Sequence, residues 1–87
     1  MQYKVELKPK AFKFLKSIPI NDKEKIEKKL LEISKNPRNE GVIKLSNRNP
    51  DQYRVRQGDY RILFIIIDMK LIVEVIDIAH RKDAYRD

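Results

Sequence analysis

The chain has 87 residues, of which 41% are hydrophobic, with no cysteine and a formal net charge of +7. This length predicts one domain, over residues 1–87, and the apolar content argues against disorder. Disulfides and thiolate metal sites are excluded, no group of residues has metal-ligand spacing, and no cofactor is expected. The basic charge favours a polyanionic partner: nucleic acid, an anionic membrane surface or an acidic protein.

The N-terminal half predicts a strand followed by two helices. Residues 3–8 alternate between apolar and polar, which is typical of a half-buried strand. Pro9 fits the first turn of a helix that ends before Pro19, because the apolar residues between them have helical spacing. A second helix is expected next, with Asn21 or Asp22 as its N-cap.

The C-terminal half predicts three strands. The sequence SKNP (34–37) ends the second helix, and a polar loop follows over 36–52, within which VIKL (42–45) could lie extended. Residues 53–67, YRVRQGDYRILFIII, predict a β-hairpin, and residues 71–79 predict a further strand. The order strand, helix, helix, strand, strand, strand gives an α+β fold. We expect a small, mostly antiparallel sheet with an N-terminal helical hairpin packed on one face.

The hairpin brings arginines together on one face of the sheet. Gly58 and Asp59 fit a two-residue turn, with glycine where a type II′ turn prefers it. This register places Arg56 directly opposite Arg61, and Arg54 lies two residues before Arg56, so all three share a face. Because like charges directly opposed destabilise a sheet, the pair suggests a bound anion between them.

The next hairpin is expected to extend this basic patch. If residues 69–70 form its turn, Ile78 pairs with Arg61 and His80 points to the arginine face. Guanidinium groups suit phosphate because their planar fork binds two oxygens and stays charged. The patch is therefore a candidate site for a phosphodiester.

Such a patch could cleave RNA without a metal, because RNA carries its own nucleophile, the 2′-hydroxyl. The reaction needs cations on the phosphate and proton transfer at two oxygens. Arg61 and Arg81 are candidates for the cations, and His80 or Tyr85 for the proton transfer. Arg54 and Arg56 suit binding, since a guanidinium group stays charged and is a poor base.

The stretch YRVRQGDYRILFIIID, an apolar strand and AHRKDAY, in this order, resemble the RelE/ParE superfamily of toxins, and RelE-type members most closely. The resemblance covers essentially the whole chain. It implies a toxin of a type II toxin–antitoxin system that cleaves mRNA in the ribosomal A site and inhibits translation. It also implies an acidic, partly disordered antitoxin that wraps the toxin, contact with operator DNA only through that complex, and a cytoplasmic location without membrane attachment.

The resemblance assigns roles to individual positions. The family's arginine after the turn falls on Arg61, its late arginine on Arg81 and its C-terminal tyrosine on Tyr85, and we predict that these positions are catalytic. Its two basic positions before the turn fall on Arg54 and Arg56, and a common basic loop position falls on Lys44, in IKL; we predict that these three bind RNA. The best-known bacterial member has lysines at the first two hairpin positions, one of them considered for proton transfer. Arginine there moves that role to His80 or Tyr85.

Alternatives stay open. ParE-type relatives share the fold but act on DNA gyrase without nuclease activity, and they generally lack the clustered basic and tyrosine positions. The chain could also be an inactive module that acts only with its antitoxin in operator binding. For Arg54 and Arg56, the simpler alternative is an ion pair with Glu74 or Asp77.

Overall fold

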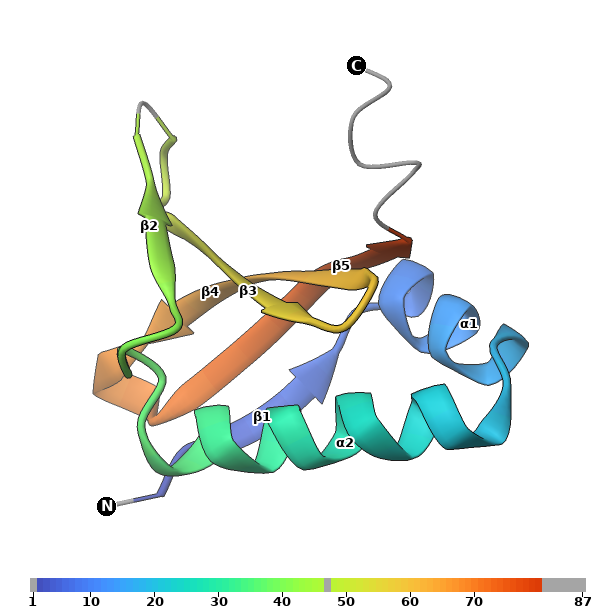
Figure 1. Ribbon diagram of the computed structural model, residues 1–87. Helices are drawn as coiled ribbons and strands as arrows, with labels where there is room; N and C mark the ends of the chain where they lie inside the picture. Colours follow the sequence, from blue (N-terminus) through green and yellow to red (C-terminus); the bar gives the residue numbers. More distant parts are fainter. Residues whose placement is uncertain (1, 47, 81–87) are drawn as a thin grey trace.

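The described part of the chain forms a five-stranded sheet and two α-helices, whose arrangement can be followed in Figure 1. The computed structural model describes residues 2–46 and 48–80. The elements, in chain order, are β1 (Lys4–Leu7), α1 (Pro9–Ser17), α2 (Ile20–Lys35), β2 (Ile43–Leu45), β3 (Gln52–Gln57), β4 (Tyr60–Ile67), the 3₁₀ turn η1 (Asp68–Lys70) and β5 (Ile72–His80). The predicted α+β class and helical pair are confirmed.

The strands have the spatial order β1-β5-β4-β3-β2. β1 pairs with β5 in parallel, and the other three pairs are antiparallel, so the sheet is mostly antiparallel as predicted. The segment VIKL supplies one strand more than the predicted order contains, because its residues 43–45 pair with β3 as β2. The two helices carry the chain from β1, at one edge of the sheet, toward β2, at the other edge.

The core lies between the helices and one face of the sheet. Buried side chains come from both helices and from β3, β4 and β5: Ala11, Leu15, Ile26, Leu30, Ile33, Val55, Ile62, Phe64, Val73, Val75 and Ile78. Alternate strand residues therefore point into the core, and the residues between them point to the opposite face. This alternation decides which charged side chains can meet.

The start of α2 differs from the prediction. The helix begins at Ile20 with Pro19 as its N-cap, and no side chain caps it, so the predicted cap by Asn21 or Asp22 is wrong. The carboxylate of Asp22 instead accepts a hydrogen bond of 2.8 Å from the hydroxyl of Tyr60 on β4. The Asp22 carboxylate oxygen that was expected to cap the helix therefore accepts a hydrogen bond from a residue of the sheet instead.

The β3–β4 turn has the predicted form. Gly58 has a φ of 59°, in the left-handed region, and Asp59 has no positive φ, as a type II′ turn requires. Nothing lies within 4 Å of the position that a Cβ would take at Gly58. The backbone conformation, rather than crowding, therefore explains glycine here.

Candidate active site

The hairpin of β3 and β4 places three arginines on the face opposite the core. Arg56 lies directly opposite Arg61, and Arg54 lies opposite Leu63, as predicted. Val55 and Ile62 form the pair between them and are buried on the other face. Because side chains alternate along each strand, Arg54, Arg56 and Arg61 share one face, which we call the arginine face.

A groove of about 450 Å³ runs over part of the arginine face. Arg54 and Arg61, both half-buried, line it together with two cations from elsewhere in the chain, Lys10 on α1 and Arg48 in the loop before β3. Apolar side chains, among them Phe14, supply much of the remaining lining. The groove combines fixed positive charge with an apolar surface, as a phosphate-linked base requires.

Lys10 and Arg48 were missed from the sequence. Lys10 is one of several lysines with helical spacing, and Arg48 is a polar loop residue, so neither position carries a signal of its own. Only the packing of α1 beside β5, and the pairing of β2 with β3, bring these residues to the groove.

His80 lies on the opposite face from Arg61, so the prediction that it shares the arginine face is wrong. Near the turn the β4–β5 register agrees with the prediction, with Ile67 opposite Ile72. A β-bulge between Leu63 and Phe64 then shifts the register by one residue, so that Arg61 faces Ala79 instead of Ile78. A shift of one residue reverses the face to which every later side chain points.

On the core side, His80 belongs to a polar cluster with Tyr60 of β4 and Asp22 of the first turn of α2. It lies opposite Tyr60, and the two rings form an edge contact with centroids 5.3 Å apart. The hydrogen bond that Tyr60 donates to Asp22 raises the pKa of the tyrosine hydroxyl. This cluster ties the β3–β4 hairpin to α2, and none of its three residues lines the groove.

The structure does not bring Lys44 to the arginines. It lies opposite Tyr53, whereas Arg54 is the next residue along β3, so the two point to different faces. Its ammonium lies 3.3 Å from the carboxylate of Asp51. Its assignment to RNA binding is therefore unsupported by the geometry.

The carboxylates Glu74 and Asp77 were alternative partners for the hairpin arginines. Each of them instead lies 3.6 Å from a lysine ammonium, Glu74 from Lys8 and Asp77 from Lys10. Asp77 is also part of the groove lining. The two other predicted site residues, Arg81 and Tyr85, lie outside the described residues.

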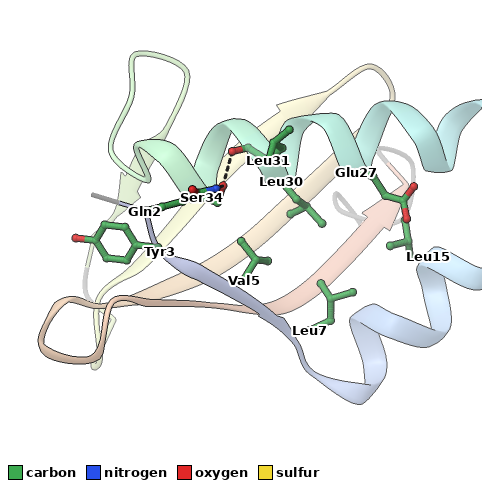
Figure 2. A pocket seen from close by; sticks show the side chains of 9 residues that line it. All are labelled: Gln2, Tyr3, Val5, Leu7, Leu15, Glu27, Leu30, Leu31 and Ser34. Carbon is green, nitrogen blue, oxygen red and sulfur yellow. Dashed lines mark hydrogen bonds between the residues drawn. The ribbon is translucent and has the colours of Figure 1, made fainter.

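A second concavity has a different character. An apolar groove of about 430 Å³ lies between β1 and α2. Figure 2 shows Val5, Leu7 and Leu30 pointing into it. Among the described residues that line it, Glu27 is the single charged one. Such a surface suits an apolar chain and is unsuited to a phosphate.

The described residues contain no cluster of three or more histidines and carboxylates that could hold a metal ion. Neither of the two α-helices in the described part of the chain is long and apolar enough to cross a membrane.

Comparison with known proteins places the chain in a family. The family model for the ParE toxin of the type II toxin–antitoxin system parDE matches residues 5–85. The chain is also similar to the mRNA interferase toxin RelE of Escherichia coli K12, with 32% identity over 84 residues, covering 94% of this chain and 86% of the relative.

Solved structures agree in fold. A chain of the archaeal RelE–RelB complex from Pyrococcus horikoshii OT3 matches with a TM-score of 0.80 and 24% identity, over 100% of both chains. A chain of the intact E. coli RelBE toxin–antitoxin complex matches with a TM-score of 0.78 and 30% identity, over 90% of this chain and 95% of the other. By sequence and by fold, this chain belongs to the RelE/ParE superfamily of type II toxin–antitoxin toxins.

Proposed function

We propose that this toxin is an mRNA endoribonuclease that cleaves mRNA in the ribosomal A site and so inhibits translation. The observation that carries the proposal is the direct opposition of Arg56 and Arg61, beside Arg54, on the arginine face. Like charges directly opposed lower the stability of a sheet, and an anion bound between the two guanidinium groups would offset this cost. The relative from E. coli, named as an mRNA interferase toxin, supports the same activity.

The reaction we propose needs no metal. The 2′-hydroxyl of the nucleotide before the break attacks the phosphorus, and the 5′-oxygen of the next nucleotide leaves. The products are a 2′,3′-cyclic phosphate and a 5′-hydroxyl. Arg61, half-buried in the groove, stabilises the charge that builds on the phosphate oxygens, and Arg81 is assigned the same role by family resemblance. Arg54 and Arg56 bind the phosphate backbone.

Proton transfer is assigned to Tyr85 in preference to His80. Both were candidates from the sequence, but the β-bulge turns His80 to the core side, against Tyr60. A group that moves a proton must come within hydrogen-bond reach of the reacting oxygen. Tyr85 holds the position of the family's C-terminal tyrosine and keeps the role on resemblance.

The proposed partners follow from the same family. Two similar chains were solved in complexes with RelB antitoxins, which supports a cognate antitoxin for this toxin. We expect an acidic, partly disordered protein, because a net charge of +7 favours a negatively charged partner that folds on binding. Operator DNA is contacted only through that complex, and the toxin acts in the cytoplasm, where it meets ribosomes and mRNA.

A second candidate function is inhibition of DNA gyrase without nuclease activity. The description of the matching family model, which names a ParE toxin, favours it. The opposed arginine pair favours the nuclease, because a protein-binding inhibitor has no need of a phosphate site.

The test is mRNA cleavage in a translating extract. Purified toxin, free of antitoxin, is added with a defined mRNA, and breaks are mapped by primer extension, with a reaction without ribosomes alongside. We expect ribosome-dependent breaks that disappear with Arg61→Ala and persist weakly with Arg61→Lys, which keeps the charge but loses the fork. Intact mRNA with unaffected translation, together with inhibition of gyrase supercoiling, would favour the second candidate.

A further inference from the structure

The arginine-face groove contains one carboxylate among its cations. Asp77 lines the groove together with Lys10, Arg48, Arg54 and Arg61. A carboxylate repels a phosphate, so its place in an anion groove calls for a reason. A basic groove that had only to hold the RNA backbone would bind more tightly without it.

Asp77 reaches the groove because of the β-bulge. Without the shift of register between Leu63 and Phe64, the preceding residue of β5, Ile76, would lie opposite Leu63, and Asp77 would point to the core side. With the bulge, Asp77 lies opposite Leu63 and two residues before Ala79, which faces Arg61. The carboxylate is thus a diagonal neighbour of Arg61, within reach of one nucleotide.

The ion pair of Asp77 with Lys10 does not account for this position. The two charged groups are 3.6 Å apart, and the lysine side chain is 78% exposed whereas that of Asp77 is 31% exposed. Ion pairs with one such exposed partner contribute little to stability. A ligand with hydrogen-bond donors can displace so exposed a lysine from the carboxylate.

The remaining lining explains what the carboxylate can recognise. Apolar side chains of Phe14, Leu45 and Leu63 lie along the same groove, and they offer a surface on which a flat base can pack. A phosphate on Arg54 and Arg61 and a base on the apolar surface would present the edge of that base to the side chain of Asp77.

We propose that Asp77 is a specificity-determining residue that recognises guanine in the mRNA bound to this groove, an inference that rests on the proposed nuclease function. Guanine is the base whose Watson–Crick edge carries two adjacent N–H donors, N1–H and N2–H, which match the two oxygens of a carboxylate. Adenine and cytosine place a ring-nitrogen acceptor beside their amino group, and uracil places carbonyl oxygens on both sides of its N3–H. Each of them therefore directs a lone pair at the carboxylate.

The test compares cleavage at A-site codons with and without guanine for the wild type, Asp77→Asn and Asp77→Ala. We expect both variants to lose about tenfold or more of the cleavage rate at guanine codons, the scale of one bidentate base contact. At codons without guanine, cleavage should stay the same or rise, because a negative charge has left the groove. Equal changes at all codons, or none, would overturn the assignment.

Glu74→Gln is the matched control. Glu74 lies on the same strand and at the same 3.6 Å from a lysine, yet it does not line the groove. The Glu74→Gln variant also removes one negative charge from β5, and it should leave the codon preference unchanged. If this variant shifted the codon preference as much as Asp77→Asn does, the loss of one negative charge would explain the shift, and the assignment of guanine recognition to Asp77 would be wrong.

A binding measurement separates this inference from the nuclease proposal. Guanosine, adenosine, cytidine and uridine 5′-monophosphates are titrated against the full chain, with the backbone amide signals of residues 61 and 77 followed by NMR. We expect guanosine monophosphate to bind most tightly and to lose this advantage with Asp77→Asn. Selective guanine binding without cleavage would leave the inference standing and overturn the nuclease proposal, whereas cleavage without base selectivity would do the reverse.

Discussion

Arg38 and Arg61 lie near opposite ends of β4 and differ in the residue that each one faces. At the end that leads into η1, the guanidinium of Arg38 donates two hydrogen bonds to the carboxylate of Asp68, of 3.0 and 2.8 Å, and lies over the ring of Tyr53. The hydroxyl of Tyr3 donates a third, of 2.6 Å. At the other end, Arg61 faces Arg56.

The difference separates stability from function. The arrangement around Asp68, which we call the Asp68 clamp, joins the loop after α2 to the end of β4 and satisfies its charges internally. The arginine face places like charges opposite one another beside a groove that can take a ligand. We infer that the clamp contributes to folding and that the arginine face sacrifices some folding stability for binding.

Among the substitutions that test this comparison, Arg61→Ala should have the largest effect on mRNA cleavage. We expect the rate of mRNA cleavage in a translating extract to fall by about 10²-fold or more, as is typical when a group that stabilises transition-state charge is removed. Its melting temperature should stay close to that of the wild type, because the variant removes one of two opposed charges. A large loss of melting temperature would mean that Arg61 is structural.

Arg56→Glu should change stability and activity in opposite directions. An opposite-charge pair across β3 and β4 replaces a like-charge pair, so the free energy of unfolding should rise by up to about 1 kcal/mol. Cleavage should fall, because a carboxylate now lies beside Arg61. Denaturant unfolding and primer extension measure the two effects, and a variant that is both less stable and fully active would contradict the comparison.

Asp68→Asn should lower stability without changing cleavage measured well below the melting temperature. The hydrogen bonds from Arg38 and Tyr3 lower the pKa of Asp68 from 3.8 to about 2. A lowered pKa means that the folded state prefers the ionised form. The stabilisation is therefore fully present above about pH 4 and is lost as the pH falls toward 2.

The pH dependence of that variant is its check. Melting curves from pH 7 to pH 2 should show the wild type above Asp68→Asn at neutral pH, with the two approaching one another below about pH 4. A difference that stays constant over this range would show that the carboxylate charge is not what holds the clamp.

Lys44→Ala should have the smallest effect. Lys44 points to the other face of the sheet from Arg54 and lies beside Asp51. We expect cleavage to change by less than about twofold, since an exposed charge that points to the other face and lies beside a carboxylate is largely screened. A substantial loss of cleavage would restore the family-based assignment of Lys44 to RNA binding.

The hairpin could be predicted from the sequence because its determinants are local. The pair Gly58-Asp59 fixes the turn, the turn fixes the register, and the register fixes the opposition of Arg56 and Arg61. The class of the fold followed from the order of apolar patterns, and the helix boundaries followed from Pro9 and Pro19.

The features of the candidate site that depend on tertiary structure could not be predicted from the sequence. The β-bulge adds a residue to β5, where Ile76 has no partner between Val75 and Asp77, and no local pattern marks it. The bulge decides the side to which His80 and Asp77 point. Asp22 likewise leaves its expected cap position because a hydroxyl from β4 reaches it. Lys10 joins the groove only through the packing of α1.

The most direct test of this account measures mRNA cleavage and thermal stability on the same preparations of Arg61→Ala and Arg38→Ala. At a temperature below both melting transitions, we predict that Arg61→Ala is stable and inactive, and that Arg38→Ala is less stable but cleaves mRNA on ribosomes at close to the wild-type rate. If Arg38→Ala loses cleavage as fully as Arg61→Ala, or if neither variant loses it, the assignment of catalysis to the arginine face is wrong.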